Sequence, residues 1–180
     1  MGKNILIITG SPRKGGNSAR MAETFTEAAE ARGHTVSRVD ASFEKVKGCM
    51  ACNRCYSDGR PCVTDDGFTG IGEMIEKADA VVLCTPVYWY TFPANIKAVI
   101  DKFYALVVGQ KNTEKECALI ACCEEHDMTV LDGVRVPYER TVALLKWRNV
   151  GEVLIPGVLN VGDIDGTDGC AQAAALAERF

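Results

Sequence analysis

The sequence predicts a doubly wound α/β fold: five parallel strands in the order 2-1-3-4-5, with helices on both faces of the sheet. Short apolar runs alternate with segments of helical periodicity along the 180 residues, as in such folds. The apolar run at residues 5–8 has no polar face, which is typical of a strand covered on both sides. A glycine-rich turn follows this strand, where such sheets bind ligands. No repeat or linker interrupts the pattern, so we expect residues 1–180 to form a single domain.

The order of the elements follows from these patterns. Strands are expected at the short apolar or β-branched runs, residues 5–8, 35–39, 80–84, 118–122 and 153–155. Helices are expected where apolar residues recur every three or four positions, at residues 18–32, after 66, after 93, within 131–148 and at 170–179. Pro93 suits the first turn of the third helix. Pro137 marks either the start or a kink of the fourth helix, and Gly151 is expected to end it.

The composition of the chain argues against several classes of partner and of function. The net charge of −4 argues against nucleic acid as a partner. No apolar run approaches membrane length and the first residues lack the form of a signal peptide, so we expect a cytoplasmic protein without a membrane partner. The nine cysteines then indicate reduced thiols or metal ligands rather than disulfides. Four of them stand in or beside apolar runs and are expected to be core residues: Cys84, Cys117, Cys122 and Cys170.

The turn at residues 10–18 has the composition of a phosphate-binding loop. Its glycines let the backbone approach a ligand, Ser11 and Ser18 offer hydroxyls, and Arg13 can bind two phosphate oxygens. The helix that follows directs free N–H groups and its positive dipole end at the same place. The turn matches neither the Walker pattern nor the dinucleotide fingerprint, which favours a terminal phosphomonoester. The alternative is an ordinary surface turn.

A second turn, at residues 85–93, is rich in aromatic residues. Tyr88, Trp89 and Tyr90 are adjacent and follow the end of a strand, so they cannot all face one core. This pattern predicts that they face a ligand, and the alternative is plain core packing.

With both turns in place, the chain resembles the flavodoxin-like NAD(P)H-dependent FMN reductases. The resemblance rests on Gly-Ser-Pro-Arg-x-Gly-x-x-Ser at residues 10–18, Pro-Val-Tyr-Trp at 86–89 and the segment 92–103. It implies that FMN is the cofactor and NAD(P)H the co-substrate. Hydride would pass from the nicotinamide to the flavin and on to a flavin, quinone or similar acceptor. Because the flavin does the chemistry, no catalytic side chain is assigned.

The resemblance also implies roles for individual residues. The first loop would hold the FMN phosphate through Ser11, Arg13, Asn17 and Ser18. The second would line the flavin through Pro86, Val87, Tyr88 and Trp89. The loop at residues 123–125 would touch the ring edge, although it lacks the glycines often found there.

The segment at residues 41–66 is too long for an ordinary connection and carries a compact cysteine motif. Its cysteines have the pattern C-x₂-C-x₂-C-x₆-C: Cys49, Cys52, Cys55 and Cys62. This spacing is closer to runs that hold cubane iron–sulfur clusters than to zinc ribbons. It is also similar to the iron–sulfur flavoproteins, in which a [4Fe–4S] cluster would exchange single electrons with FMN. Structural zinc and free thiols are the alternatives.

Three functions therefore stay open: an FMN-dependent NAD(P)H oxidoreductase, an iron–sulfur flavoprotein electron carrier, and a non-enzymatic module that binds a phosphate ligand. In the first two, the partner is a small-molecule electron acceptor or a redox protein. The resemblance also implies a homodimer or higher homo-oligomer, because a flavin slot in a chain of this size is shallow. The cysteine loop is the candidate for completing a neighbour's slot.

Overall fold

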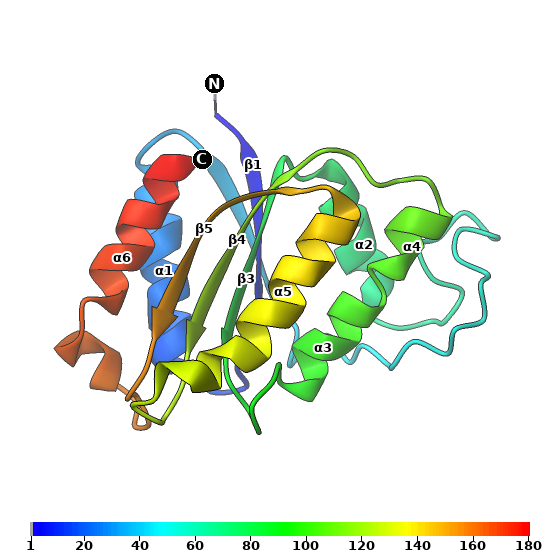
Figure 1. The fold of residues 1–180 in the computed structure, drawn as a ribbon. Coiled ribbons are helices and arrows are strands. Elements are labelled where there is room, and N and C mark those ends of the chain that lie inside the picture. Colours follow the sequence, from blue (N-terminus) through cyan, green and yellow to red (C-terminus); the bar gives the residue numbers. More distant parts are fainter. Residues whose placement is uncertain (1) are drawn as a thin grey trace.

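A computed structural model describes residues 2–180 and contains one five-stranded parallel sheet (Figure 1). The strand order is β2-β1-β3-β4-β5, so the predicted 2-1-3-4-5 order is confirmed. The strands are β1 (Asn4–Thr9), β2 (Thr35–Asp40), β3 (Ala80–Pro86), β4 (Glu116–Cys122) and β5 (Arg148–Ile155). Their carboxyl ends all point to one edge of the sheet, which places the connecting turns together.

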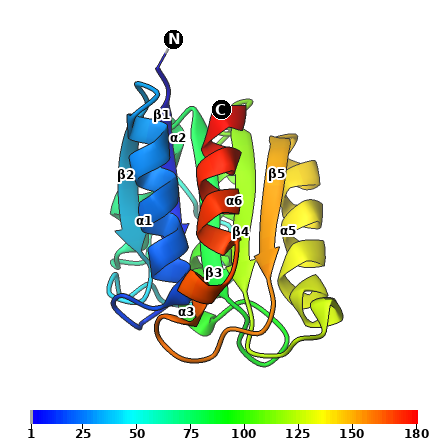
Figure 2. The ribbon, with the colours of Figure 1, turned by 90° about the vertical axis from the view of Figure 1, so that its left-hand side faces the viewer.

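Helices cover both faces of the sheet, as predicted (Figure 2). They are α1 (Asn17–Glu30), α2 (Phe68–Lys77), α3 (Ala94–Asp101), α4 (Tyr104–Val108), α5 (Asp132–Leu145) and α6 (Gly169–Leu176). Buried residues of α1 and α6 form one core against the sheet, and those of α2, α3, α4 and α5 form another on the opposite face. In the part of the chain that the structure describes, no helix is both long and apolar enough to cross a bilayer.

The buried strands explain this arrangement. The side chains of residues 5–8 are 0–1% exposed, because they alternate between the two cores. Cys84, Cys117 and Cys122 are likewise buried, as expected, and Cys170 is half-buried against the core of α1 and α6.

The second half of the chain departs from the sequence prediction in three places. Helix α5 runs through Pro137, which therefore does not mark its start, and α4 was not predicted. The prediction that Gly151 ends the helix is wrong: α5 ends at Leu145, and Lys146 takes the left-handed conformation (φ 56°). Gly151 instead lies within β5 beside a register shift against β4, and a Cβ there would collide with Arg179.

Charged residues form an ion-pair network at the edge of the sheet where the strands begin. The Glu116 carboxylate lies 2.6 Å from Lys3 Nζ and also accepts a hydrogen bond from Arg148. Burial opposes ionisation of this carboxylate, but the hydrogen bonds from the two cations outweigh burial and lower the pKa of Glu116.

We therefore predict that Glu116→Gln destabilises the protein in a pH-dependent way. At pH 7 we expect a loss of about 1–2 kcal/mol, because a charge-assisted network is removed. The pKa is lowered in the folded state, so the stabilisation is fully present above the unfolded-state value of about 4.3 and is lost as the pH falls through the folded-state value. Urea unfolding at neutral and acidic pH measures this, with the exposed Glu114→Gln as the control. A difference from the parent that stays constant with pH would contradict the prediction.

Candidate functional site

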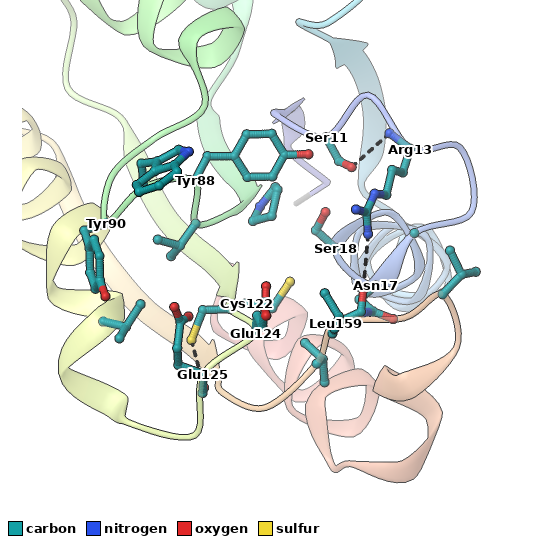
Figure 3. Close-up of a pocket in the computed structure, with 18 residues that line it drawn as sticks. Ser11, Arg13, Asn17, Ser18, Tyr88, Tyr90, Cys122, Glu124, Glu125 and Leu159 are labelled. Carbon is teal, nitrogen blue, oxygen red and sulfur yellow. Dashed lines mark hydrogen bonds between the residues drawn. The ribbon is translucent and has the colours of Figure 1, made fainter.

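A cavity of about 530 Å³ lies at the carboxyl ends of the strands (Figure 3). Its walls come from the turns after β1, β3 and β4 and from the segment after β5. All eight residues that the sequence analysis assigned to a ligand line this cavity: Ser11, Arg13, Asn17, Ser18, Pro86, Val87, Tyr88 and Trp89. The structure thus brings the two predicted loops together, while the contacts of each residue with a ligand stay a prediction.

The glycine-rich turn is fixed at the end of β1 by close backbone packing. Gly10 N donates to Cys84 O of β3 at 2.9 Å. A Cβ on Gly10 would lie 2.5 Å from Thr85 Oγ1 and 2.8 Å from an Ile96 methyl, so only glycine fits without a shift. Helix α1 then begins at Asn17, and its first residues line the cavity. Its free N–H groups and dipole favour an anion here.

The polar side chains of this turn have different surroundings. Ser18 is 2% exposed and lines the cavity. Asn17 is already engaged with the segment after β5: Nδ2 donates to Asn160 O at 2.9 Å and Oδ1 accepts from Ile164 N at 3.3 Å. Arg13 is exposed and donates to Leu159 O at 3.2 Å, which leaves further guanidinium donors free for a ligand. In this structure, Asn17 therefore acts as a support for the cavity wall.

The aromatic turn after β3 is a tight, strained hairpin. Tyr88 and Thr91 exchange backbone hydrogen bonds of 2.9 and 3.1 Å. Trp89 and Tyr90, between them, have positive φ angles of 47° and 61°, a conformation that costs about 1–3 kcal/mol per residue. Trp89 is 94% exposed and Tyr90 62% exposed, so core packing is the wrong interpretation for both.

The end of β4 contributes two thiols and two carboxylates. Cys122 and Cys123 are buried at the cavity wall, and Cys122 O accepts from Val87 N at 2.8 Å, which joins this wall to the aromatic turn. Burial, reinforced by the Glu125 carboxylate, raises the pKa of Cys123, so its thiol stays neutral. Glu124 and Glu125 are exposed and line the cavity where the sequence analysis placed the ring edge.

The cavity wall that follows β5 was not predicted from the sequence. Val158, Leu159 and Val161 line the cavity and give it an apolar side. These residues carry no recognisable motif, but they follow the carboxyl end of a strand. That position is the one signal that could have found them.

The four motif cysteines gather at a second, separate cavity of about 20 Å³. Their loop, coloured cyan in Figure 1, lies beside α4, and Lys102 and Tyr104 complete the cavity wall. Cys49 and Cys52 are exposed, whereas Cys55 and Cys62 are half-buried. Among residues 2–180, no three potential ligands converge closely enough for a single metal ion. A cubane binds each thiolate through a different iron, so four thiols around one cavity remain a suitable donor set for it.

The cysteine thiols of this loop influence one another's pKa. Burial raises the pKa of Cys55, and negative charge on Cys62, Cys49 and Cys52 raises it further. The backbone amide of Arg54 instead lowers the pKa of the exposed Cys52. If all four thiols ionised they would repel one another, and a bound cationic centre would relieve that repulsion.

Curated relatives match more than half of the chain. An iron–sulfur flavoprotein of Archaeoglobus fulgidus is 35% identical over 108 residues, which cover 60% of this chain and 48% of the relative. An iron–sulfur flavoprotein of Methanosarcina thermophila is 37% identical over 105 residues, which cover 58% of this chain and 53% of that relative. The chain thus spans about half the length of the curated relatives it matches.

Solved structures share the fold. An NAD(P)H:quinone oxidoreductase from Methanothermobacter marburgensis superimposes with a TM-score of 0.74 and 18% identity, covering 99% of this chain and 94% of the other. An azoreductase from Bacillus anthracis str. Sterne gives a TM-score of 0.75 and 18% identity, covering 99% and 100%. At these identities the likeness shows the fold alone.

A sequence model of one family covers most of the chain. It matches residues 3–132, which include the glycine-rich turn, the cysteine loop and the aromatic hairpin, and its description is NADPH-dependent FMN reductase. The resemblance drawn from the sequence is thereby confirmed, and the chain belongs to the NADPH-dependent FMN reductase family.

Proposed function

We propose that this protein is an FMN-dependent oxidoreductase that takes hydride from NAD(P)H and passes electrons to a flavin, a quinone or a similar acceptor. One observation carries the proposal: a single cavity is lined by all eight residues that the family resemblance assigns to the FMN phosphate and flavin. Its volume of about 530 Å³ lies within the range of small-molecule and cofactor sites. Family membership supports the same cofactor.

The cavity offers different surroundings at its two ends. The start of α1, with Ser18 and Arg13, would bind the phosphate through backbone amides, a hydroxyl and a guanidinium. The hairpin and the end of β4 would enclose the flat ring, and Leu159 and Val158 would exclude water from one side. The flavin supplies hydride and electron transfer when bound, so these residues bind and orient it and need not move a proton.

A second candidate function is that of an iron–sulfur flavoprotein electron carrier. The observation that favours it is the convergence of Cys49, Cys52, Cys55 and Cys62 on one cavity. The relatives at 35% and 37% identity are themselves iron–sulfur flavoproteins. These four thiolates would hold a [4Fe–4S] cluster, which supplies one-electron transfer when bound.

Helix α3 separates the two cavities. It begins directly after the aromatic hairpin, with Pro93 as its N-cap, and ends before Lys102 of the cysteine cavity. Its eight residues correspond to about 12 Å at 1.5 Å per residue. The two candidate centres therefore lie near opposite ends of one short helix.

We also propose a homodimer or higher homo-oligomer in which the cysteine loop of one chain lies against the flavin cavity of another. Trp89 at the cavity and Met50 in the loop support this, being 94% and 68% exposed apolar side chains. We expect sedimentation to show a dimer that Trp89→Ser together with Met50→Ser weakens at least about tenfold, since two apolar contacts are lost. Leu144→Ser, at an exposed site on α5, is the control. A parent protein that is monomeric at full FMN affinity would refute the proposal.

The proposed phosphate-binding role of Arg13 and Ser18 predicts how their removal changes FMN affinity. Arg13→Ala combined with Ser18→Ala should weaken FMN binding about 100-fold or more, because two hydrogen bonds to a charged group are lost. The circular dichroism spectrum should stay that of the parent, since Arg13 is exposed and alanine fits the Ser18 site. Flavin fluorescence measures the affinity. Lys14→Ala is the matched control, because Lys14 belongs to the same turn and is exposed but does not line the cavity. Retained stoichiometric flavin would show that the turn does not hold the phosphate.

Anaerobic purification decides between the two candidate functions. About four irons and four sulfides per chain beside FMN, with a broad brown absorbance, are expected for the carrier. Cys62→Ser should then lower the iron content, because a ligand is lost, whereas Cys170→Ser, outside the loop, should not. A yellow flavin spectrum without iron would leave the hydride-accepting reductase.

A further inference from the structure

The loop at residues 47–66 carries all four motif cysteines but little regular backbone structure. Backbone hydrogen bonds within it lie between residues 54 and 60. Ala51, Asn53 and Tyr56 have positive φ angles of 51°, 55° and 59°, which cost about 1–3 kcal/mol each. Such a conformation persists only when surrounding contacts determine it. The order of this loop must therefore come from side chains that tie it to the rest of the protein.

One carboxylate joins the two ends of the loop. Asp66 Oδ2 accepts from Lys47 N at 2.8 Å, and Asp66 Oδ1 accepts from Phe68 N at 3.0 Å. Lys47 opens the loop and Asp66 closes it, so a single side chain sets the distance between its ends. The bond to Phe68 also fixes that side chain to the first turn of α2.

Lys102 neutralises this carboxylate from the other side. Its Nζ lies 2.6 Å from Asp66 Oδ2, and the two side chains are 2% and 1% exposed. The ammonium also lies 5.5 Å from the centre of the Phe68 ring. A buried charge left without its partner is costly, so each member of the pair holds the other in place. Lys102 itself lines the cysteine cavity, which connects the ion pair directly to that cavity.

The same loop contains an exposed ion pair that serves as a comparison. Asp58 Oδ2 lies 2.7 Å from Arg60, but the two side chains are 40% and 42% exposed. Exposed pairs contribute little to stability. This pair joins residues two positions apart and does not connect the ends of the loop.

We propose that Asp66 and Lys102 are positioning residues for the cysteine cavity. Their buried ion pair holds the ends of the loop together and keeps Cys55 and Cys62 turned into the cavity, where they can receive a metal centre. The reference to a metal centre rests on the second candidate function, whereas the ordering of the thiols stands on the contacts above.

The variant Asp66→Asn tests this directly. The carboxylate uses both oxygens, one for Phe68 N and the other for Lys47 N and Lys102 Nζ. An amide has only one acceptor oxygen, so at least one of these donors loses its partner. Asp58→Asn is the matched control, because it makes the same chemical change in the same loop at an exposed site.

The first measurement is the rate at which iodoacetamide modifies each cysteine of the metal-free, FMN-loaded protein, read by mass spectrometry. We expect Asp66→Asn to speed modification of the half-buried Cys55 and Cys62 about tenfold or more. The reason is that the loop that carries these two cysteines is no longer held in place at its ends. The exposed Cys49 and Cys52 should react quickly in every variant and provide an internal reference. Modification at the parent rate in Asp66→Asn would overturn the proposal.

The second measurement is iron and sulfide content after anaerobic reconstitution. Asp66→Asn should take up less iron than the parent, and Asp58→Asn the same amount. If the parent takes up none, the carrier function fails, while the modification rates still decide the positioning role. Full iron uptake by Asp66→Asn together with parent modification rates would refute that role.

A double variant separates positioning from plain stability. Asp66→Leu with Lys102→Met replaces a buried ion pair by apolar side chains, a change that often leaves stability unaltered or raised. The backbone tethers are nevertheless lost, so we expect a melting temperature near that of the parent with rapid modification of Cys55 and Cys62. Slow modification in the double variant would show that packing alone orders the loop and would overturn the proposal. If Asp66→Asn does not fold, this double variant still tests whether Asp66 and Lys102 position the loop.

Discussion

The candidate site depends on the close approach of three backbone segments at Gly10. Here the end of β1 hydrogen-bonds to β3 while the side chains of Thr85 and Ile96 occupy the space that a Cβ would need. Thr85 leads into the aromatic hairpin and Ile96 belongs to α3, which follows it. The packing at Gly10 therefore fixes the glycine-rich turn and the hairpin relative to each other. The cavity between them therefore depends on strand register as well as on loop conformation.

Charge is distributed unevenly along this cavity. Arg13 and the start of α1 make one end attractive to an anion, whereas Glu124 and Glu125 place carboxylates at the end of β4. A ligand with a phosphate at one end and a neutral ring at the other fits this polarity in one orientation only. Carboxylates near a ring that accepts electrons disfavour added negative charge, so they lower the tendency of the ring to be reduced. The charge pattern thus bears on both the orientation and the reducing power of a bound flavin.

Local patterns sufficed to predict much of this structure. Apolar runs located β1, β3 and β4, because burial on both faces leaves few polar positions, and the two turns were found from their glycines and aromatics. The exposed edge strand β2 was found from its β-branched residues, whereas only the last three residues of β5 were predicted. The features that were predicted wrongly or not at all depend on contacts between residues far apart in the sequence. Gly151 was predicted to end a helix, but it lies in β5, where a Cβ would meet Leu176 and Arg179 of the last segment. The apolar wall at Leu159 has no motif of its own. Asp66 was placed only at the end of the 41–66 segment, before a helix, because its partner Lys102 stands 36 residues further along the chain.

The two cavities differ in what holds them together, and this difference bears on their relative stability. The first cavity is built on the register of β1, β3 and β4 and shares the buried core of the protein. The cysteine cavity is built on a strained loop held by one buried ion pair, by partly buried residues such as Cys55 and Cys62 that pack against the core, and by a few tyrosine contacts. Local stability is lower where core contacts are fewer, so the loop can lose its order while the sheet and its cavity persist. The reverse is excluded by the same physics, because Lys102 and the wall of the cysteine cavity are positioned by α3, which itself rests on the sheet.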